Sequence, residues 1–202
     1  MIISSNTNEI ANALNKNQVV CFKTDTIWGL SANPTNKEAV KNLYTFKQRN
    51  VDKPFIFLIK KDEDLSKIVK SISPTEQKLI NAFWPGPLTI IFKAKNNLDI
   101  LSHYTQKQTI ALRMPNDSLC QELLAKINYP LPSTSVNIEG QPFLNSFEEI
   151  TKTFKDNDFV IYQLENNNTK VSSTIVCCEG EKVNVLREGS ITKNQIENCL
   201  KN

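Results

Sequence analysis

The chain has 202 residues, of which 40% are hydrophobic and 22% are charged, and its net charge is +3. This length and composition predict one ordinary globular domain over residues 1–202, with enough chain to bury a core. The small charge argues against a dedicated nucleic-acid binder, which would carry a dense basic stripe. We expect no membrane association, because no apolar run reaches the roughly 18 residues of a membrane helix, and Met1–Asn8 does not resemble a secretory signal.

Cysteine, histidine and glycine usage narrows the chemistry. The five cysteines have no C-x-x-C spacing, which argues against a disulfide framework or a zinc site and favours a reducing cytoplasm. The single histidine, His103, lies in a polar stretch and is expected in a surface loop. We therefore predict no metal site. The five glycines form neither a G-x-G-x-x-G turn nor a Walker loop, so side chains would have to bind the phosphates of any nucleotide.

Strands and helices are predicted to alternate along the chain. Short apolar runs bounded by turn residues predict strands, and apolar positions at steps of three and four predict helices. The expected strands are 18–22, 55–59, 88–92, 109–114, 159–162, 173–176 and 182–186. The expected helices are 36–46, 73–83, 118–127 and a short one after residue 191. A stiff turn is expected at 84–87. This order is typical of an α/β domain with a mixed, largely buried sheet.

Three polar segments interrupt this framework. Lys47 and Arg49 are two residues apart, so they can converge only if the helix ends there, as Asn50, Asp52 and Pro54 suggest. Both could instead be cations that stabilise the C-terminal end of the helix. Residues 133–137 offer hydroxyl and amide groups but could also form a simple turn. Residues 172–174 and 186–189 form the third segment, in which Arg187 could bind an anion or form a surface ion pair.

The joint order of these segments resembles the YrdC-like family. The chain has K-T-D-T-I-W-G-L at 23–30, K-Q-R followed by D-K-P within 47–54, and F-W-P-G-P-L-T at 83–89. It continues with T-I-A-L-R-M-P at 109–115, S-T-S-V-N with a later glycine at 133–140, S-T-I-V at 173–176 and L-R-E-G-S-I at 186–191. The matching blocks extend from about residue 19 to residue 192.

The resemblance implies a fold and an activity. The fold would be a twisted mixed α/β sheet with flanking helices around a large basic cavity, similar to double-stranded-RNA-binding α/β folds. The activity would be that of a nucleotidyltransferase that condenses L-threonine, bicarbonate or CO2, and ATP into threonylcarbamoyl-AMP and pyrophosphate. The product would serve tRNA threonylcarbamoyladenosine modification, with transient contact to tRNA or its modification machinery. ATP, with Mg²⁺, would be a substrate, and no tightly bound organic cofactor is implied.

The resemblance also assigns site residues. The catalytic, nucleotide-side group is Lys47, Arg49, Ser135 and Asn137, and the further ATP contacts are Lys53, Thr109 and Arg187. The threonine contacts are Thr26, Arg113, Ser133 and Ser173, with the planar guanidinium of Arg113 binding the carboxylate.

This chain departs from the family pattern at several positions. Lys23 replaces a proline, Leu58 a histidine near threonine, Phe143 a serine near ATP, and Cys177 an aspartate. Two other functions stay open at this point. One is an RNA-binding or ribosome-associated module that uses the same basic cavity. The other is a carbamoyl-transfer domain like those of hydrogenase-maturation proteins, which the short chain disfavours.

Overall fold

The structure is a computed structural model that describes residues 1–50, 53–63, 65–96, 98, 100, 108–162 and 171–201. In chain order its elements are β1 (Ile2–Ser4), α1 (Thr7–Asn15), β2 (Val20–Lys23), β3 (Trp28–Ser31), α2 (Lys37–Lys47), β4 (Ile56–Leu58), the 3-10 helix η1 (Leu65–Lys67), α3 (Pro74–Phe83), β5 (Leu88–Lys93), β6 (Thr109–Arg113), α4 (Ser118–Ala125), β7 (Leu131–Ser135), α5 (Phe147–Thr153), β8 (Val160–Tyr162), β9 (Thr174–Glu179), β10 (Lys182–Arg187) and α6 (Lys193–Lys201).

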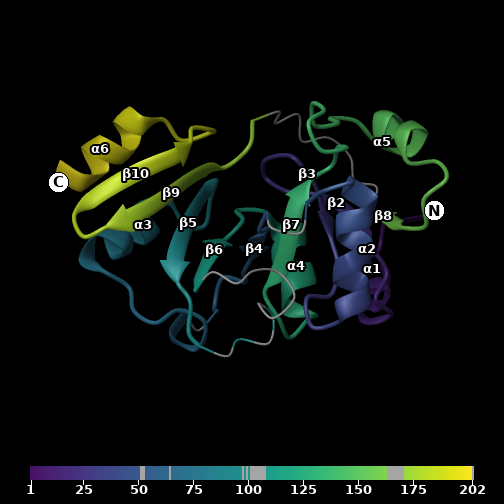
Figure 1. The fold of residues 1–202 in the computed structure, drawn as a ribbon, viewed down its shortest axis with the longest axis horizontal. Coiled ribbons are helices and arrows are strands. Elements are labelled where there is room, and N and C mark those ends of the chain that lie inside the picture. The colour runs from purple at the N-terminus through teal and green to yellow at the C-terminus, as the bar shows by residue number, and fades with distance from the viewer. Residues whose placement is uncertain are drawn as a thin grey trace.

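The described strands form one mixed sheet in the order β1-β8-β2-β3-β7-β4-β6-β5-β9-β10. The β1–β8, β2–β8, β4–β6 and β5–β9 pairs are parallel, and the β2–β3, β3–β7, β4–β7, β5–β6 and β9–β10 pairs are antiparallel. In Figure 1 the sheet extends from β8, near the N-terminus, to β10, near the C-terminus. Strand β7 joins the two halves of the sheet, so residues at its end lie between them.

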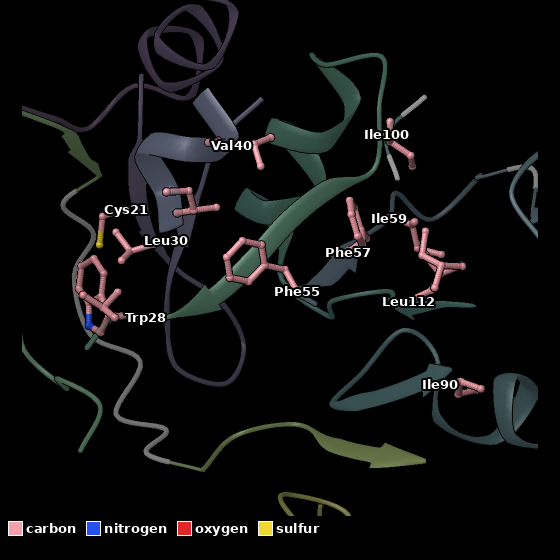
Figure 2. Close-up of a cluster of buried hydrophobic side chains, with 14 of the residues drawn as sticks. Cys21, Trp28, Leu30, Val40, Phe55, Phe57, Ile59, Ile90, Ile100 and Leu112 are labelled. Atoms are coloured by element: carbon pink, nitrogen blue, oxygen red, sulfur yellow. The ribbon is translucent and has the colours of Figure 1, made fainter. Parts of the chain in front are cut away.

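Both faces of the sheet are buried, and consecutive residues of a strand enter different core clusters. Cys21 packs in the larger cluster, while its neighbours Val20 and Phe22 pack in the smaller one; Phe57 and Leu58 divide in the same way. This is the period of two expected for a pleated strand. Figure 2 shows part of the larger cluster, from Cys21, Trp28 and Leu30 at one end to Ile59 and Leu112 at the other. Fully buried apolar side chains of this size each stabilise the fold by roughly 1.5–3 kcal/mol.

The helices are divided between the two clusters. Helices α2, α3, α5 and α6 contribute buried residues to the larger cluster, and α1 and α4 contribute to the smaller one. The predicted helix start at Pro74 is confirmed, and its N-cap Ser73 forms a capping box with Glu76. None of the helices in the described ranges is long and apolar enough to cross a membrane.

The predicted elements are confirmed to within a few residues, and several further elements were missed. The missed elements are β1, α1, β3, η1, β7 and α5. The alternative that residues 133–137 form a turn is wrong for their first three residues, because Ser133–Ser135 belong to β7 in the middle of the sheet. The turn predicted at 84–87 is present and contains a cis Trp84–Pro85 bond. His103 lies outside the described residues.

Candidate functional site

A cavity of about 150 Å³ lies on the sheet, over the junction between its two halves. Seven of the eleven predicted site residues line it: Thr26, Arg49, Arg113, Ser133, Ser135, Ser173 and Arg187. The volume is smaller than the large cavity that the resemblance implies, since small-molecule clefts usually measure about 300–1,000 Å³. Three arginines and several hydroxyl groups therefore face a narrow space.

Strand pleating explains why these side chains meet. On β3, β4 and β6, the residues Trp28, Leu30, Phe57 and Leu112 enter the larger core cluster. The residues between or beside them on the same strands, Gly29, Ile56 and Arg113, line the cavity. In β7, Ser133 and Ser135 are two apart and both line it. Polar side chains of adjacent strands thus gather at one place on the sheet, although Trp28, which packs in the larger cluster, and Thr134 also line the cavity.

Arg113 is 2% exposed and is held by three different partners. Its Nε donates to Gly86 O at 3.2 Å, its Nη1 donates to Thr26 Oγ1 at 2.7 Å, and its Nη2 donates to the carboxylate of Asp25. The Asp25 carboxylate also accepts the backbone N–H of Asn116 at 3.1 Å. These contacts use three of the five N–H donors of a guanidinium, so the plane is fixed while donors remain for a ligand carboxylate.

The direction of the hydrogen bonds at Thr26 follows from its neighbour. Thr24 Oγ1 donates to Ile27 O at 3.0 Å and accepts the backbone N–H of Thr26 at 3.2 Å. Because Thr24 has one hydroxyl proton, Thr26 Oγ1 must donate in the 2.9 Å bond between the two hydroxyls. Thr26 therefore offers the cavity an acceptor and not a donor, which suits an amino group.

Ser133 approaches the backbone of β3 closely. A Cβ atom at Gly29 would lie 2.7 Å from Ser133 Oγ, shorter than real Cβ contacts allow. Gly29 pairs with Ser135 across the β3–β7 ladder. The absence of a side chain at Gly29 is what allows the Ser133 hydroxyl to occupy this position beside the cavity.

Arg187 and Ser173 form a second polar group at the other side of the cavity. Arg187 Nε and Nη2 donate to Ser173 O at 3.1 and 2.7 Å, and Nη2 also donates to Ser173 Oγ at 3.1 Å. Thr89 Oγ1 lies 2.9 Å from the same hydroxyl. Burial and the charge of Arg113 lower the pKa of Arg187. Two guanidinium groups that repel each other across a cavity favour an anion between them.

Lys47 is buried at the end of α2, and its ammonium group is directed toward β7. Nζ donates to Ser135 O at 2.5 Å and to Asn137 Oδ1 at 2.7 Å. Ser135 Oγ donates to the same Asn137 oxygen at 2.7 Å. Burial, and to a lesser extent the charge of Arg49, lower the pKa of Lys47 to about 7. The predicted association of Lys47, Ser135 and Asn137 is thus present as one hydrogen-bonded group.

Arg49 reaches the cavity because α2 ends at Lys47, as the sequence predicts. Gln48 caps the helix in the left-handed conformation, with φ of 51°, and turns the chain. Arg49 then donates to Lys53 O at 3.3 Å and to Pro54 O at 3.1 Å, and its guanidinium lies 5.1 Å from the centre of the Phe55 ring. The alternative that Lys47 and Arg49 only stabilise the helix end does not account for these contacts.

Two predicted ATP contacts are placed differently. Lys53 is exposed and its ammonium group lies 2.5 Å from the Glu139 carboxylate. Thr109 begins β6 and pairs with Lys93, at the opposite end of the strand from Arg113, and it is not among the described residues that line the cavity. The structure therefore does not bring Thr109 to this cavity, because an extended strand separates its two ends by more than 10 Å.

Asp25 and Glu139 pair with the predicted site residues Arg113 and Lys53, but they were not themselves predicted. A buried arginine requires a partner, which could have pointed to Asp25 because it precedes Thr26. Glu139 follows Asn137 by two residues, but its partners at residues 50 and 53 are remote in sequence.

The positions where the chain departs from the family pattern have ordinary surroundings. Leu58 is fully buried and packs in the smaller core cluster. Phe143 is half-buried in the segment between β7 and α5, and Cys177 is half-buried on β9. Lys23 ends β2, and burial lowers its pKa.

Within the described ranges, no group of three or more His, Cys, Asp or Glu side chains could hold a metal ion.

Comparisons with known proteins agree with this geometry. The Sua5–YciO–YrdC family model, described as "Telomere recombination", matches residues 12–189. A Bacillus subtilis protein named threonylcarbamoyl-AMP synthase is 34% identical and aligns with 96% of this chain, which spans 57% of that longer relative. A Vibrio campbellii protein of the same name is 30% identical, with 91% of this chain and 99% of the relative covered. The Pyrococcus abyssi Sua5 structure complexed with L-threonine superposes with a TM-score of 0.86 at 26% identity, covering 98% of this chain and 59% of that one. This chain therefore belongs to the Sua5–YciO–YrdC family.

Proposed function

We propose that this protein is a threonylcarbamoyl-AMP synthase, a nucleotidyltransferase that condenses L-threonine, bicarbonate or CO2, and ATP and releases pyrophosphate. The observation that carries the proposal is the arrangement of one cavity. A fixed guanidinium with neutral hydroxyls lies beside a second group of cations, as joint binding of an amino acid and a triphosphate requires. Relatives named for this activity align with almost the whole chain.

The threonine end of the site would be formed around Arg113. Its remaining N–H donors would bind the carboxylate, because a planar fork matches the two carboxylate oxygens. Thr26 Oγ1, which is available as an acceptor, would bind the amino group. Ser133 and Ser173 would contact the rest of the amino acid. The half-buried Asp25 offsets the charge of Arg113 and prevents its guanidinium from turning away.

The nucleotide end would be formed by Lys47, Arg49, Ser135 and Asn137, with Lys53 and Arg187 as further cations. Arg49 and Arg187 both line the cavity, and Lys53 precedes Pro54, which also lines it. We leave Thr109 out of this site because of its position on β6. Fixed cations of this kind neutralise the charge that develops on departing pyrophosphate.

Catalysis would depend on the positioning of the substrates more than on a reactive side chain. The neutral amine of threonine attacks CO2 and loses a proton, which forms a carbamate. A carbamate oxygen then attacks the α-phosphorus of ATP as the bond to pyrophosphate breaks. Holding the carbamate and the α-phosphate together in one cavity supplies most of the acceleration. No step needs a histidine or a cysteine.

Several wider features belong to the same proposal. ATP would enter with Mg²⁺ as a substrate complex, and no tightly bound organic cofactor is required. The product would pass to the machinery that modifies tRNA. All five cysteines are free, which supports a cytoplasmic location. Residues 1–202 would act as one domain, since one continuous sheet includes every described strand.

Pyrophosphate release tests this proposal. The protein should release pyrophosphate from MgATP only when both L-threonine and bicarbonate are present. L-Serine is a useful comparison, because it lacks one methyl group, and L-valine lacks the hydroxyl. Release that ignores threonine, or tight RNA binding without any release, would instead favour a different function on the same fold.

A further inference from the structure

Glu139 connects the segment after α2 to the segment after β7 through hydrogen bonds and an ion pair. Its backbone N–H donates to Lys47 O at 3.0 Å. One carboxylate oxygen accepts the backbone N–H of Asn50 at 3.1 Å, and the other accepts the ammonium group of Lys53 at 2.5 Å. A backbone N–H and an ammonium group are the donors that proteins commonly present to a phosphate group.

Glu139 also lies within the electrostatic reach of the cavity. Burial lowers the pKa of Arg49, and the charge of Glu139 offsets part of this shift. Arg49 lines the cavity, and its guanidinium donates a hydrogen bond to Lys53 O. In return, the hydrogen bond from Lys53 and the one from Asn50 lower the pKa of the Glu139 carboxyl. Glu139 is therefore ionised at neutral pH and offsets part of the positive charge of Arg49 and Lys53.

The small volume of the cavity bears on how a nucleotide would reach Asn50 and Lys53. Its volume of about 150 Å³ is below the roughly 300–1,000 Å³ that is usual for clefts that hold a small ligand. A nucleotide bound beside an amino acid would need more space than this, and Asn50 and Lys53 are the chain neighbours of Arg49 and Pro54, which line the cavity. Phosphates that extended past Arg49 would meet the Asn50 N–H and the Lys53 ammonium group, which Glu139 now binds, so carboxylate and phosphate would compete for them.

We propose that Glu139 holds the place of a nucleotide phosphate: its carboxylate binds Lys53 and the Asn50 N–H until the triphosphate of ATP, or pyrophosphate, displaces it. Glu139 thereby sets the affinity for polyanions and favours the departure of pyrophosphate by rebinding Lys53. The identity of the polyanion as ATP rests on the proposed function. The exchange is non-covalent and leaves every bond intact.

The test measures binding of MgATP and of inorganic pyrophosphate by titration calorimetry to the full chain. Glu139→Gln removes the charge and keeps the shape and the acceptor for Asn50. We expect the Kd of both ligands to fall about 2- to 5-fold, the range of an exposed ion pair. Glu38→Gln is the matched control, because Glu38 is exposed and pairs with Lys41 in the first turn of α2. It should leave both Kd values unchanged.

A second variant separates competition from simple structural support. In a Lys53→Met background, Glu139→Gln should tighten binding by less, since the displaced partner is already missing.

Unchanged or weaker binding by Glu139→Gln, in protein whose thermal melting matches the wild type, would overturn the proposal. If Glu139→Gln melts early, Glu139→Ser must show the same tightening, and its failure to do so is also decisive. Adenylate synthesis by the wild type with no effect at Glu139 would reject this inference alone, whereas tighter pyrophosphate binding without synthesis would reject only the proposed function.

Discussion

Lys47 Nζ donates a 2.5 Å hydrogen bond to Ser135 O, although 88 residues separate the two in sequence. This bond joins the end of α2 to the end of β7, where the two halves of the sheet meet. It places a desolvated amino group beside Ser135, which lines the cavity. The stability of the protein should therefore depend on the protonation of this one lysine.

Lys47→Met should change how stability varies with pH. In the native protein the pKa of Lys47 is about 7, against an ordinary value of 10.5. Below pH 7 the amine is charged in both the folded and the unfolded protein, so burial of the charge lowers the free energy of unfolding by its full cost. Between pH 7 and 10 the unfolded chain binds more protons at Lys47 than the native protein does. The free energy of unfolding of the wild type therefore increases as the pH rises. Relative to Lys47→Met, the wild type should gain about 2–4 kcal/mol over this range.

Urea denaturation at a series of pH values measures this difference. Lys41→Met is the control, because Lys41 is 70% exposed and pairs only weakly with Glu38. Its stability curve should run parallel to that of the wild type. Parallel curves for Lys47→Met as well would show that the amine is not desolvated as described.

Arg113→Lys should impair threonine use selectively. The substitution keeps the positive charge beside Asp25 but removes the planar fork that would bind a carboxylate. We expect kcat/KM for threonine to fall about 30- to 1,000-fold, equivalent to about 2–4 kcal/mol. The Kd of MgATP, measured by calorimetry, should change little. Weaker MgATP binding with unchanged kcat/KM for threonine would place Arg113 at the nucleotide instead.

Arg49→Ala should have the complementary effect. Arg49 lines the cavity and is held by two carbonyl oxygens and the ring of Phe55. Its loss should lower kcat/KM for ATP about 30- to 1,000-fold and leave the Kd of threonine nearly unchanged. Steady-state kinetics with each substrate varied in turn makes the distinction. Near-wild-type kinetics would remove Arg49 from the site.

Gly29→Ala should destabilise the protein through a defined clash. The new methyl group would lie 2.7 Å from Ser133 Oγ. We expect a loss of about 1–3 kcal/mol in the free energy of unfolding, as in other overpacked sites. Ser133→Ala in the same chain should restore most of this stability, because it removes the Oγ atom with which the methyl group clashes. A double variant as unstable as Gly29→Ala would show that the backbone, not Ser133, is the obstacle.

The sequence predicts local features well and remote contacts poorly. The end of α2 at Lys47 follows from the turn-forming residues Asn50 and Pro54, and the structure confirms it. Strand β7 was missed because Pro132, its second residue, is of a type rarely found within central strands. Its position between β3 and β4 overrides that propensity. Pro132 is tolerated because β3 pairs only with Thr134 and Ser135.

The same limit applies to the site. The resemblance identifies hydroxyls and cations that line the cavity, since their residue types occur in continuous blocks. It does not reveal that Asp25 holds Arg113 or that Glu139 holds Lys53, because each pair joins segments more than 80 residues apart. The position of Thr109 was not predictable either, since the direction of β6 in the sheet depends on its neighbours.

The most direct test of joint binding in one cavity is mass spectrometry of the product formed from MgATP, L-threonine and isotopically labelled bicarbonate. We predict an adenylate that contains threonine and carries the labelled carbon, and its yield should fall sharply in both Arg49→Ala and Arg113→Lys. An adenylate without the label, or a labelled product that forms equally well in both variants, would contradict the account.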